Sequence, residues 1–291
     1  MTALRKKMQA DLGLRGLAPG TRDHYLRCVK KFAEYFWRSP ADLGTAEVRQ
    51  FLQHLQQLGR KPPTIIVYWA ALLFVYKVTL RRPEIMADVP RPRVPRRDPV
   101  PALTEAEVSA LLDAAASEFD QTLLSVMYAC GLRVSAVCAL QVGDVDARAR
   151  LLHIRKGKGG KSRAAPLSPE TLSMLREHWR RHRPRQPWLF PARRLVRPGV
   201  WQGDWADHPV DRKTIGDRFR KTVKRANLRR HVTLHDLRRA SATRFHELGV
   251  DLRDIQVLLG HASPETTARY VAISPEQIAR LPCLLERLKK K

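Results

Sequence analysis

Apolar residues recur along the first ninety residues with the spacing of amphipathic helices. One such segment begins at Thr21, and another begins at Thr45 and ends at Gly59. After a pair of prolines, the most apolar stretch of the chain runs for 13 residues from Thr64 to Tyr76. A membrane-spanning helix needs about 20 apolar residues. The pattern therefore predicts a helical N-terminal domain in which this stretch is a core helix and not a membrane anchor.

After residue 101, the pattern of apolar and polar residues predicts both helices and strands. The sequence Thr104-Glu105-Ala106-Glu107 has the form of a capping box, so we expect a helix to begin there and to continue through Thr122 to Ala129. Two short strands, Leu151 to Arg155 and Ser162 to Leu167, are expected on either side of a glycine-rich turn.

The remainder is expected to be mainly helical, with one irregular excursion. Ser168-Pro169-Glu170 supplies an N-cap residue and a proline at the first helical position. Residues 181–209 are basic and rich in Pro and Trp, which favours irregular surface structure, and helix predominates again from Thr214. The prolines between Val89 and Pro101 indicate a stiff, extended, basic connector.

A chain of 291 residues is long enough for one large or two ordinary domains with an ample core. The elements predict a mainly α fold with a small β-sheet. The expected division is a helical domain at 1–88, a linker at 89–101, an α+β domain at 102–273 and a C-terminal tail at 274–291.

The net charge is extreme, at +26, with 54 basic residues against 28 acidic ones. Arginine supplies most of it, with 39 Arg and 15 Lys. Arginine binds phosphate oxygens through a planar fork that lysine lacks. A field of this sign concentrates phosphate near the surface, so the charge predicts a polyanionic partner.

The four cysteines, Cys28, Cys130, Cys138 and Cys283, match no zinc spacing and no disulfide framework. They are typical of reduced thiols in a cytoplasmic protein. The charged N-terminus is followed by no apolar signal segment.

Six polar residues spread over the C-terminal two-thirds carry the candidate chemistry. They are two arginines, a lysine, two histidines and a tyrosine, in the order Arg133, Lys158, His235, Arg238, His261 and Tyr270. Each of them alone is more often structural or solvated than catalytic. Together, and with no acidic cluster for a metal, they suit attack on a phosphodiester by a protein hydroxyl.

Cutting a phosphodiester without a metal requires a nucleophile, cations on the non-bridging oxygens and an acid for the leaving oxygen. Preorganised donors at those oxygens usually supply the largest share of the acceleration. Arginine fits the oxygens in a bidentate way, and a lysine among other cations has a pKa lowered towards neutrality. Tyrosine becomes a competent nucleophile when histidine accepts its proton and arginines favour the phenolate.

The local spacings allow these residues to converge. His235 and Arg238 are three residues apart, so on a helix they share one face. Asp251 to Leu259 is expected to be a helix that Gly260 ends, and a tight turn there can direct His261 and Tyr270 at one phosphate. Lys158 lies in the glycine-rich turn between the two expected strands, where the backbone can approach DNA closely.

Four segments surround most of these candidate residues. They are Gly131-Leu132-Arg133-Val134-Ser135, Leu234-His235-Asp236-Leu237-Arg238, Leu258-Leu259-Gly260-His261 and Thr266-Thr267-Ala268-Arg269-Tyr270. Together they resemble the tyrosine recombinase (integrase) family, nearest to its Xer-like, integron-associated and transposon-associated members. The resemblance covers nearly the whole chain. It implies a helical, SAM-like core-binding domain at 1–88, a linker, and a DNA breaking-rejoining catalytic domain at 102–273.

The resemblance implies a site-specific recombinase that serves integration, excision or inversion of a DNA element. Tyr270 would attack double-stranded DNA and leave a 3′-phosphotyrosine and a free 5′-hydroxyl. Arg133 and Arg238 would hold the phosphate. In the family, four protomers hold two DNA sites, and the segment from Ser274 to Lys291 resembles one that docks on a neighbouring protomer.

The resemblance also implies roles for the other three residues. Lys158 would protonate the leaving 5′ oxygen, His235 would assist proton transfer, and His261 would hydrogen-bond the phosphate. The covalent bond stores the energy for religation, so neither ATP, a metal nor any other cofactor is expected. Two positions depart from the family pattern: Ala136 stands where members usually have Glu, and Arg239 stands where many have His.

Two other function classes remain open. Asp251 to Val271 could form a helix-turn-helix with Gly260 in the turn, as in a DNA-binding regulator that does not cleave. A topoisomerase of the nicking-closing, type IB-like kind uses similar residues and a tyrosine. Formation of a covalent adduct would distinguish a recombinase from the regulator, and recombination of paired sites would distinguish it from the topoisomerase.

Overall fold

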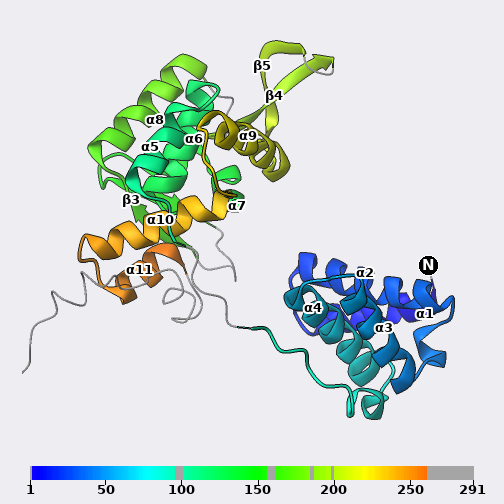
Figure 1. Ribbon diagram of the computed structural model, residues 1–291. Coiled ribbons are helices and arrows are strands. Elements are labelled where there is room, and N and C mark those ends of the chain that lie inside the picture. Colours follow the sequence, from blue (N-terminus) through cyan, green and yellow to red (C-terminus); the bar gives the residue numbers. More distant parts are fainter. Residues whose placement is uncertain (1, 96–100, 156–161, 184–186, 198–199, 261–291) are drawn as a thin grey trace, which may run out of the picture. The chain divides into compact units, whose positions relative to one another are not determined.

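The computed structural model describes residues 2–95, 101–155, 162–183, 187–197 and 200–260, with the backbone alone between 194 and 204. Contacts divide the chain into two compact units, residues 1–98 and 99–291, and each is described here by itself. Figure 1 shows a bundle of helices in the N-terminal unit and a mixed helical and stranded C-terminal unit.

The N-terminal unit is built from four main helices and short turns. Proline occupies the first turn of α2 and of α4, where its missing N–H costs no intrahelical bond. The helices are α1 (Ala3–Leu14), α2 (Pro19–Phe36), α3 (Thr45–Gln57) and α4 (Pro62–Phe74), with η1 (Pro40–Asp42), a π-helical turn η2 (Val75–Thr79) and η3 (Pro83–Met86).

Aromatic rings fill the centre of this bundle. Phe32 of α2 meets Phe51 of α3 edge to face at a centroid distance of 5.2 Å. The buried Tyr76 hydroxyl donates to the carbonyl oxygen of Pro40 at 3.0 Å, and burial raises the pKa of Tyr76. The ring packing holds α2 and α3 together, and the hydrogen bond joins η2 to η1.

The segment Pro62–Thr79 is long and apolar enough to cross a membrane, judged by length and composition alone. A single segment of this kind is weak support for a membrane span, because the core helix of a globular domain passes the same test. Ile65, Leu72 and Val75 are buried in the N-terminal core, and the neighbouring Trp69 and Phe74 pack against that core. These contacts are those of a core helix.

The C-terminal unit combines helices with a small antiparallel sheet. Its three strands lie in the order β1-β2-β3, with Leu152 opposite Ala165 and Ile154 opposite Arg163. The prediction of a mainly α fold with a small sheet is therefore confirmed. The elements are α5 (Glu105–Asp113), α6 (Glu118–Ala129), α7 (Val134–Cys138), η4 (Val142–Asp144), β1 (Val145–Asp146), β2 (Leu151–Ile154), β3 (Arg163–Pro166), α8 (Pro169–His182), β4 (Pro191–Arg197), β5 (Val200–Pro209), α9 (Arg212–Arg225), α10 (Leu234–Glu247) and α11 (Leu252–Leu259).

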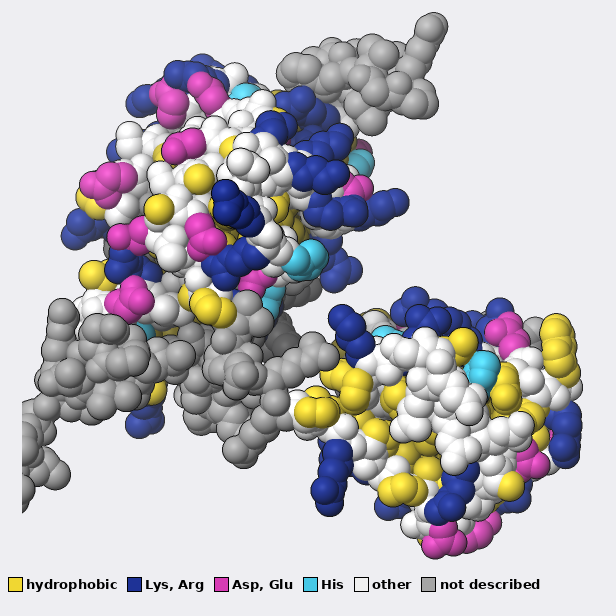
Figure 2. All heavy atoms as spheres, viewed as in Figure 1, with side chains coloured by type: hydrophobic (Ala, Val, Ile, Leu, Met, Phe, Trp, Pro, Cys, Tyr) yellow, Lys and Arg dark blue, Asp and Glu magenta, His cyan; other side chains and the backbone are white. Residues whose placement is uncertain are grey.

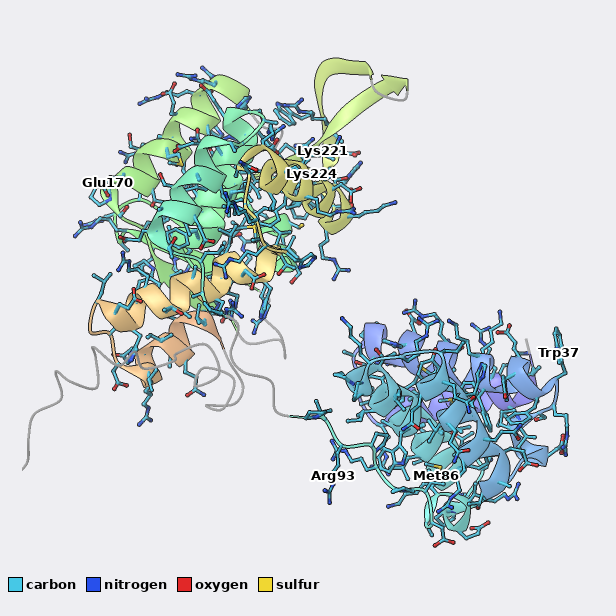
Figure 3. The ribbon with its side chains drawn as sticks, viewed as in Figure 1. Trp37, Met86, Arg93, Glu170, Lys221 and Lys224 are labelled. Atoms are coloured by element: carbon cyan, nitrogen blue, oxygen red, sulfur yellow. The ribbon has the colours of Figure 1, made fainter. Side chains whose placement is uncertain are left out.

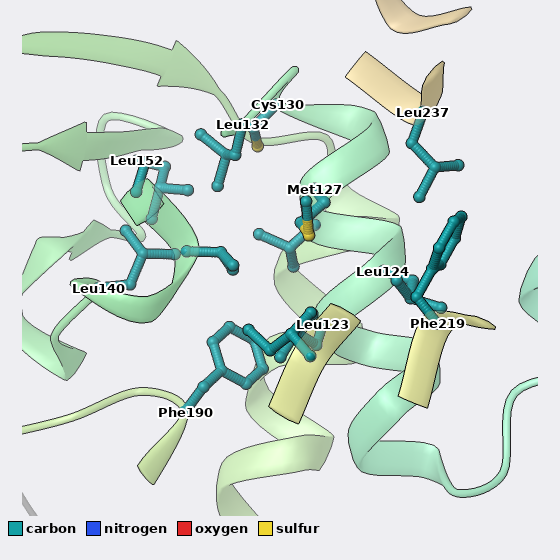
Figure 4. Packing of buried hydrophobic residues seen from close by; sticks show 14 of the residues in the cluster. Leu123, Leu124, Met127, Cys130, Leu132, Leu140, Leu152, Phe190, Phe219 and Leu237 are labelled. Atoms are coloured by element: carbon teal, nitrogen blue, oxygen red, sulfur yellow. The ribbon is translucent and has the colours of Figure 1, made fainter. Parts of the chain in front are cut away.

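Helix α6 forms the centre of this unit. Its Leu123, Leu124 and Met127 lie among side chains from the sheet, α9 and α10, including Phe219 and Leu237 (Figure 4). All of them are buried in one continuous apolar cluster. This core holds the two turns that follow α6 and α11 at fixed positions, and those turns carry the candidate site.

Several helices begin with the N-terminal caps that the sequence predicts. The Thr104 hydroxyl accepts from the Glu107 N–H at 3.2 Å, and the Glu107 carboxylate accepts from the Thr104 N–H at 2.8 Å, so the predicted capping box is present. The Ser168 hydroxyl likewise caps α8. The expectation of continuous helix from Thr104 to Ala129 was wrong, because α5 ends at Asp113 and Ser117 caps a new helix by accepting from the Asp120 N–H.

The prediction of irregular structure over 181–209 was also wrong. After α8, β4 and β5 form a two-stranded antiparallel hairpin, with shifts of register along it. Pro191 is tolerated because it is the first residue of its strand. The Trp205 ring of β5 stacks on Phe119 at 5.3 Å, and its Nε1–H donates to the His182 carbonyl at 2.7 Å. The tryptophan that suggested an irregular excursion thus anchors the hairpin to α6 and α8.

Candidate active site

The start of α10 fixes His235 and Arg238 on one helical face. The Asp236 carboxylate accepts from the Thr233 N–H at 2.8 Å and from the Thr233 hydroxyl at 2.7 Å. These bonds hold the first turn of α10 in place. His235 lies in that turn, and Arg238 follows one turn later and points into the protein.

Arg238 joins two distant turns through its guanidinium. The side chain is only 1% exposed. Its Nη1 donates to the carbonyl of Gly131, and its Nη2 donates to the carbonyl of Leu259 at 2.6 Å. Both carbonyls lie at or just beyond the C-terminal ends of helices, α6 and α11, where the helix dipoles favour a cation. The buried charge therefore ties the turn before Arg133 to the turn before His261.

Gly131 makes this close approach possible. Its φ is +55°, a left-handed conformation that residues with a Cβ rarely adopt. A Cβ at this position would lie 2.4 Å from Leu259 Cδ2. Two residues later, Arg133 occupies the N-cap position of α7 and is half-buried. The Gly-Leu-Arg motif thus combines a left-handed turn that favours glycine with an arginine at the start of α7.

Electrostatic coupling places Arg133 close to His235. The pKa of His235 lies below its usual value, first because the surrounding protein desolvates the ring, although the residue keeps contact with solvent. The positive charges of Arg238, Arg133 and Arg239 lower this pKa further, and Asp236 opposes them. The lowered pKa favours the neutral imidazole, which is the state that can accept a proton.

A buried carboxylate fixes the root of the hairpin between β2 and β3. Asp144 is 2% exposed, accepts from the Gln141 N–H at 2.8 Å and forms an ion pair with Arg155, the residue that follows β2. Lys158 lies in the sequence between β2 and β3, outside the described residues. His261 and Tyr270 also lie outside them. The structure thus brings together three of the six candidates, Arg133, His235 and Arg238.

The two departures from the family pattern have defined surroundings. Ala136 is buried in α7, so no carboxylate occupies this place. Arg239 forms an ion pair with Asp236 at 3.4 Å and donates to the carbonyl of Pro101 at 2.7 Å. Arg230 donates to the same Pro101 carbonyl at 2.8 Å. Arg239 therefore helps to fix the segment through which the chain enters the C-terminal unit.

One residue of the site, Arg163, was missed from the sequence. It begins β3, and its side chain lies against the end of α11, since a Cβ on Gly260 would be 3.0 Å from Arg163 Cδ. Residues two apart on a strand share a face, and Ala165 is fully buried. This alternation was the signal in the sequence that Arg163 points inward.

A strongly basic surface lies on α9, in the same unit. Dark-blue side chains gather over this helix in Figure 2, and Lys221 and Lys224 are labelled on it in Figure 3. Its opposite face is buried through Ile215 and Phe219. The exposed basic residues of α9 are Arg212, Lys213, Arg220, Lys221, Lys224 and Arg225. Within the described part of the chain, no group of three or more His, Cys, Asp or Glu side chains could hold a metal ion.

Comparison with known families agrees with this geometry. Residues 101–277 match the phage integrase family, and residues 4–85 match the SAM-like N-terminal domain of phage integrases. The chain belongs to the phage integrase family. The expected resemblance is confirmed, and this integrase is a tyrosine-type recombinase.

Relatives of known name support the assignment over almost the full length. The integrase is 36% identical over 280 residues to y4qK of Sinorhizobium fredii, which carries an integrase/recombinase name, covering 96% of this chain and 87% of that protein. It is 30% identical over 267 residues to tyrosine recombinase XerA of Pyrococcus horikoshii, covering 92% of this chain and 88% of that one.

Solved structures share the fold. A lambda integrase fragment, crystallised as a dimer bound to a core site, superposes with a TM-score of 0.75 at 18% identity, covering 97% of this chain and 98% of that one. The Tn1549 transposon integrase in complex with transposon right-end DNA gives a TM-score of 0.71 at 18% identity, covering 99% and 100%.

Proposed function

We propose that this integrase is a site-specific recombinase that cuts and rejoins double-stranded DNA through a 3′-phosphotyrosyl intermediate. The reaction would integrate, excise or invert a DNA element. The observation that supports it most is the buried Arg238 guanidinium, which holds the Arg133 turn and the end of α11 together. A non-cleaving regulator has no need for this arrangement.

The nucleophile would be the Tyr270 hydroxyl. It attacks phosphorus, the phosphate becomes joined to the tyrosine at the 3′ side, and the 5′ oxygen leaves. Arg133 and Arg238 would hold the non-bridging oxygens as negative charge builds up on them, which is the interaction that contributes most to such a reaction. The phosphotyrosyl bond conserves the energy of the broken linkage, so religation needs no ATP.

Three residues would handle protons and the remaining phosphate contact. Lys158 would protonate the leaving 5′ oxygen from the turn of the β2–β3 hairpin. His235 would accept the proton of the tyrosine, and its lowered pKa supports this role because a neutral imidazole is needed. His261 would donate a hydrogen bond to the phosphate.

The DNA would contact both units. The net charge of +26 and the exposed basic face of α9 support binding to the phosphate backbone. We propose that 1–88 is a core-binding domain, 89–101 a linker, 102–273 the catalytic domain and 274–291 a tail that docks on a neighbouring protomer. A lambda integrase has been crystallised as a tetramer bound to a Holliday junction, which supports a homotetrameric synapse here. The site of action would be the cytoplasm.

A covalent-adduct assay tests this proposal. The substrate is a set of nicked duplexes that tile the DNA flanking the gene of this integrase. The wild type should form an adduct that resists denaturant, and Tyr270→Phe should bind the same duplex with the same affinity and form none. An adduct with Tyr270→Phe would disprove the nucleophile. Binding without an adduct by the wild type would favour a regulator, and relaxation without joining of paired sites would favour a topoisomerase.

A further inference from the structure

Arg163 has surroundings that neither packing nor ion pairing explains. It is half-buried at the start of β3, and its Nη1 is buried without a hydrogen-bond partner among the residues that the structure describes. It also takes part in none of the ion pairs found in those residues. Burying a donor without a partner costs about 1–3 kcal/mol, more for a charged group. A leucine or methionine would fill the same space without that cost.

A second arginine lies near enough to act on Arg163 electrostatically. Desolvation by burial, and then the nearby positive charge of Arg133, lower the pKa of Arg163 to about 10. The side chain therefore remains charged at pH 7 and is repelled by Arg133. Two cations held close together, one of them with an unused donor, form a site that is completed by an anion.

The side chain of Arg163 extends past Gly260 towards the candidate phosphate site. Its stem passes Gly260, the residue directly before His261, because a Cβ there would lie 3.0 Å from Arg163 Cδ and 3.3 Å from its Nε. The left-handed turn at Gly260, with φ of +63°, leaves this space free for the stem. The guanidinium is thereby directed to the region between Arg133 and the end of α11, whose last carbonyl is held by Arg238.

We propose that Arg163 is a third phosphate-binding arginine, which donates from Nη1 to a non-bridging oxygen of the same DNA phosphate that Arg133 holds. The proposal rests on the function proposed above and adds a residue to it. In the absence of DNA, the positive charges of Arg133 and Arg163 repel each other. Phosphate binding removes the repulsion and supplies the missing acceptor, so the contact strengthens as charge builds up on the oxygens during cleavage.

The test compares Arg163→Met, which keeps the stem but removes the donors, with Arg163→Lys, which keeps the charge. Arg148→Met is the matched control, because Arg148 is exposed in the turn between β1 and β2. The substrate is the nicked duplex on which the wild type forms its adduct. Arg163→Met should slow single-turnover adduct formation by roughly 100-fold, as expected for one oxyanion donor, and Arg163→Lys should recover part of the loss. Arg148→Met should match the wild type.

A methylphosphonate at the scissile position separates phosphate contact from a structural effect. With one of its two stereoisomers, which replaces the oxygen that Arg163 would bind by a methyl group, the wild type and Arg163→Met should differ by less than about threefold. A 100-fold loss that persists with both isomers would mean that Arg163 only supports the fold, and the proposal would be overturned. So would wild-type rates for Arg163→Met on the phosphodiester.

A binding measurement keeps this inference separate from the proposed function. The measurement is the slope of log K against the logarithm of the salt concentration, where K is the association constant for the same duplexes. Arg163→Met should reduce the magnitude of this slope by about 1, the value for one lost phosphate contact, and the measurement does not require cleavage. If the wild type forms no adduct, the proposed chemistry fails, and this slope still tests the phosphate contact. An unchanged slope together with a normal adduct in the wild type would reject the Arg163 proposal alone.

Discussion

At the scale of single residues, the site depends on a cation that is bound to the backbone. Arg238 donates to carbonyls of two different turns, and the α6 and α11 helix ends stabilise its charge. The side chain therefore has two functions. It shapes the site before DNA arrives, and in the proposed reaction it also faces the phosphate.

Replacing Arg238 should affect stability and cleavage together. Arg238→Ala leaves the Gly131 and Leu259 carbonyls without their donors, so the C-terminal unit should lose roughly 2–4 kcal/mol of unfolding free energy. Arg238→Lys keeps the charge but cannot span both carbonyls, so it should lose less stability and remain poor in cleavage. Urea unfolding and the adduct rate measure the two effects. Full stability of Arg238→Ala would contradict the structural role.

Gly131 provides a second test at this scale. Gly131→Ala forces a Cβ into Leu259 and keeps a left-handed φ, so we expect a loss of about 2–4 kcal/mol. The control is Gly216→Ala within α9, where a Cβ meets nothing within 4 Å. That change should be neutral or stabilise by up to about 1 kcal/mol, because alanine favours helix. Equal effects of the two changes in urea unfolding would contradict the packing of the Gly131 turn.

At the scale of elements, local chemistry and tertiary contacts determine different features. The capping box at Thr104 and the N-cap at Ser168 were predictable, because each depends on a few adjacent residues. The β4–β5 hairpin was not, because its Trp205 is anchored on α6 and α8 by contacts between residues far apart in sequence. The same holds for Arg238. Its place in a motif could be recognised in the sequence, but the two carbonyls that it binds could not be predicted.

The helix α8 carries a titrating group in the core near this hairpin. His178 is 3% exposed, its Nε2 lies 3.3 Å from the Leu189 carbonyl, and burial lowers its pKa to about 4. In the unfolded chain a histidine titrates near 6.5. Between these values the unfolded state binds more protons, so stability should fall as the pH falls from about 6.5 to about 4, by on the order of 3 kcal/mol.

Urea unfolding between pH 7 and pH 4 tests this linkage. His178→Gln keeps a donor for the Leu189 carbonyl and cannot titrate, so its stability should vary much less across this range than that of the wild type. The control is His153→Gln, an exposed position in β2, which should keep the wild-type dependence. The account of this buried histidine fails if His178→Gln and the wild type lose stability in parallel.

At the scale of the whole molecule, the net charge follows from the composition alone, and the proline-rich connector led us to expect two domains. The arginines that fix the chain entering the C-terminal unit could not be predicted, since Arg230 and Arg239 reach the Pro101 carbonyl from more than 100 residues away along the chain. Arg239 is one of the two departures from the family pattern, and the structure gives it this anchoring contact.

The basic face of α9 should determine part of the salt dependence of DNA binding. Lys221→Gln combined with Lys224→Gln removes two exposed charges from this face, so the slope of log K against log salt should decrease by roughly 2. Arg180→Gln on α8, which removes an exposed arginine paired with Glu177, serves as the control and should leave the slope unchanged. Identical slopes for the α9 variant and the wild type would show that this face does not contact DNA.

In the proposed reaction, a tyrosine near the C-terminus becomes covalently joined to DNA. Mass spectrometry of the nuclease-trimmed, protease-digested adduct of the wild-type integrase measures this directly. We expect one modified peptide, with a nucleotide 3′-phosphate on Tyr270 and a free 5′-hydroxyl on the departing strand. A modification on another residue, or a linkage through a 5′-phosphate, would contradict the proposed reaction.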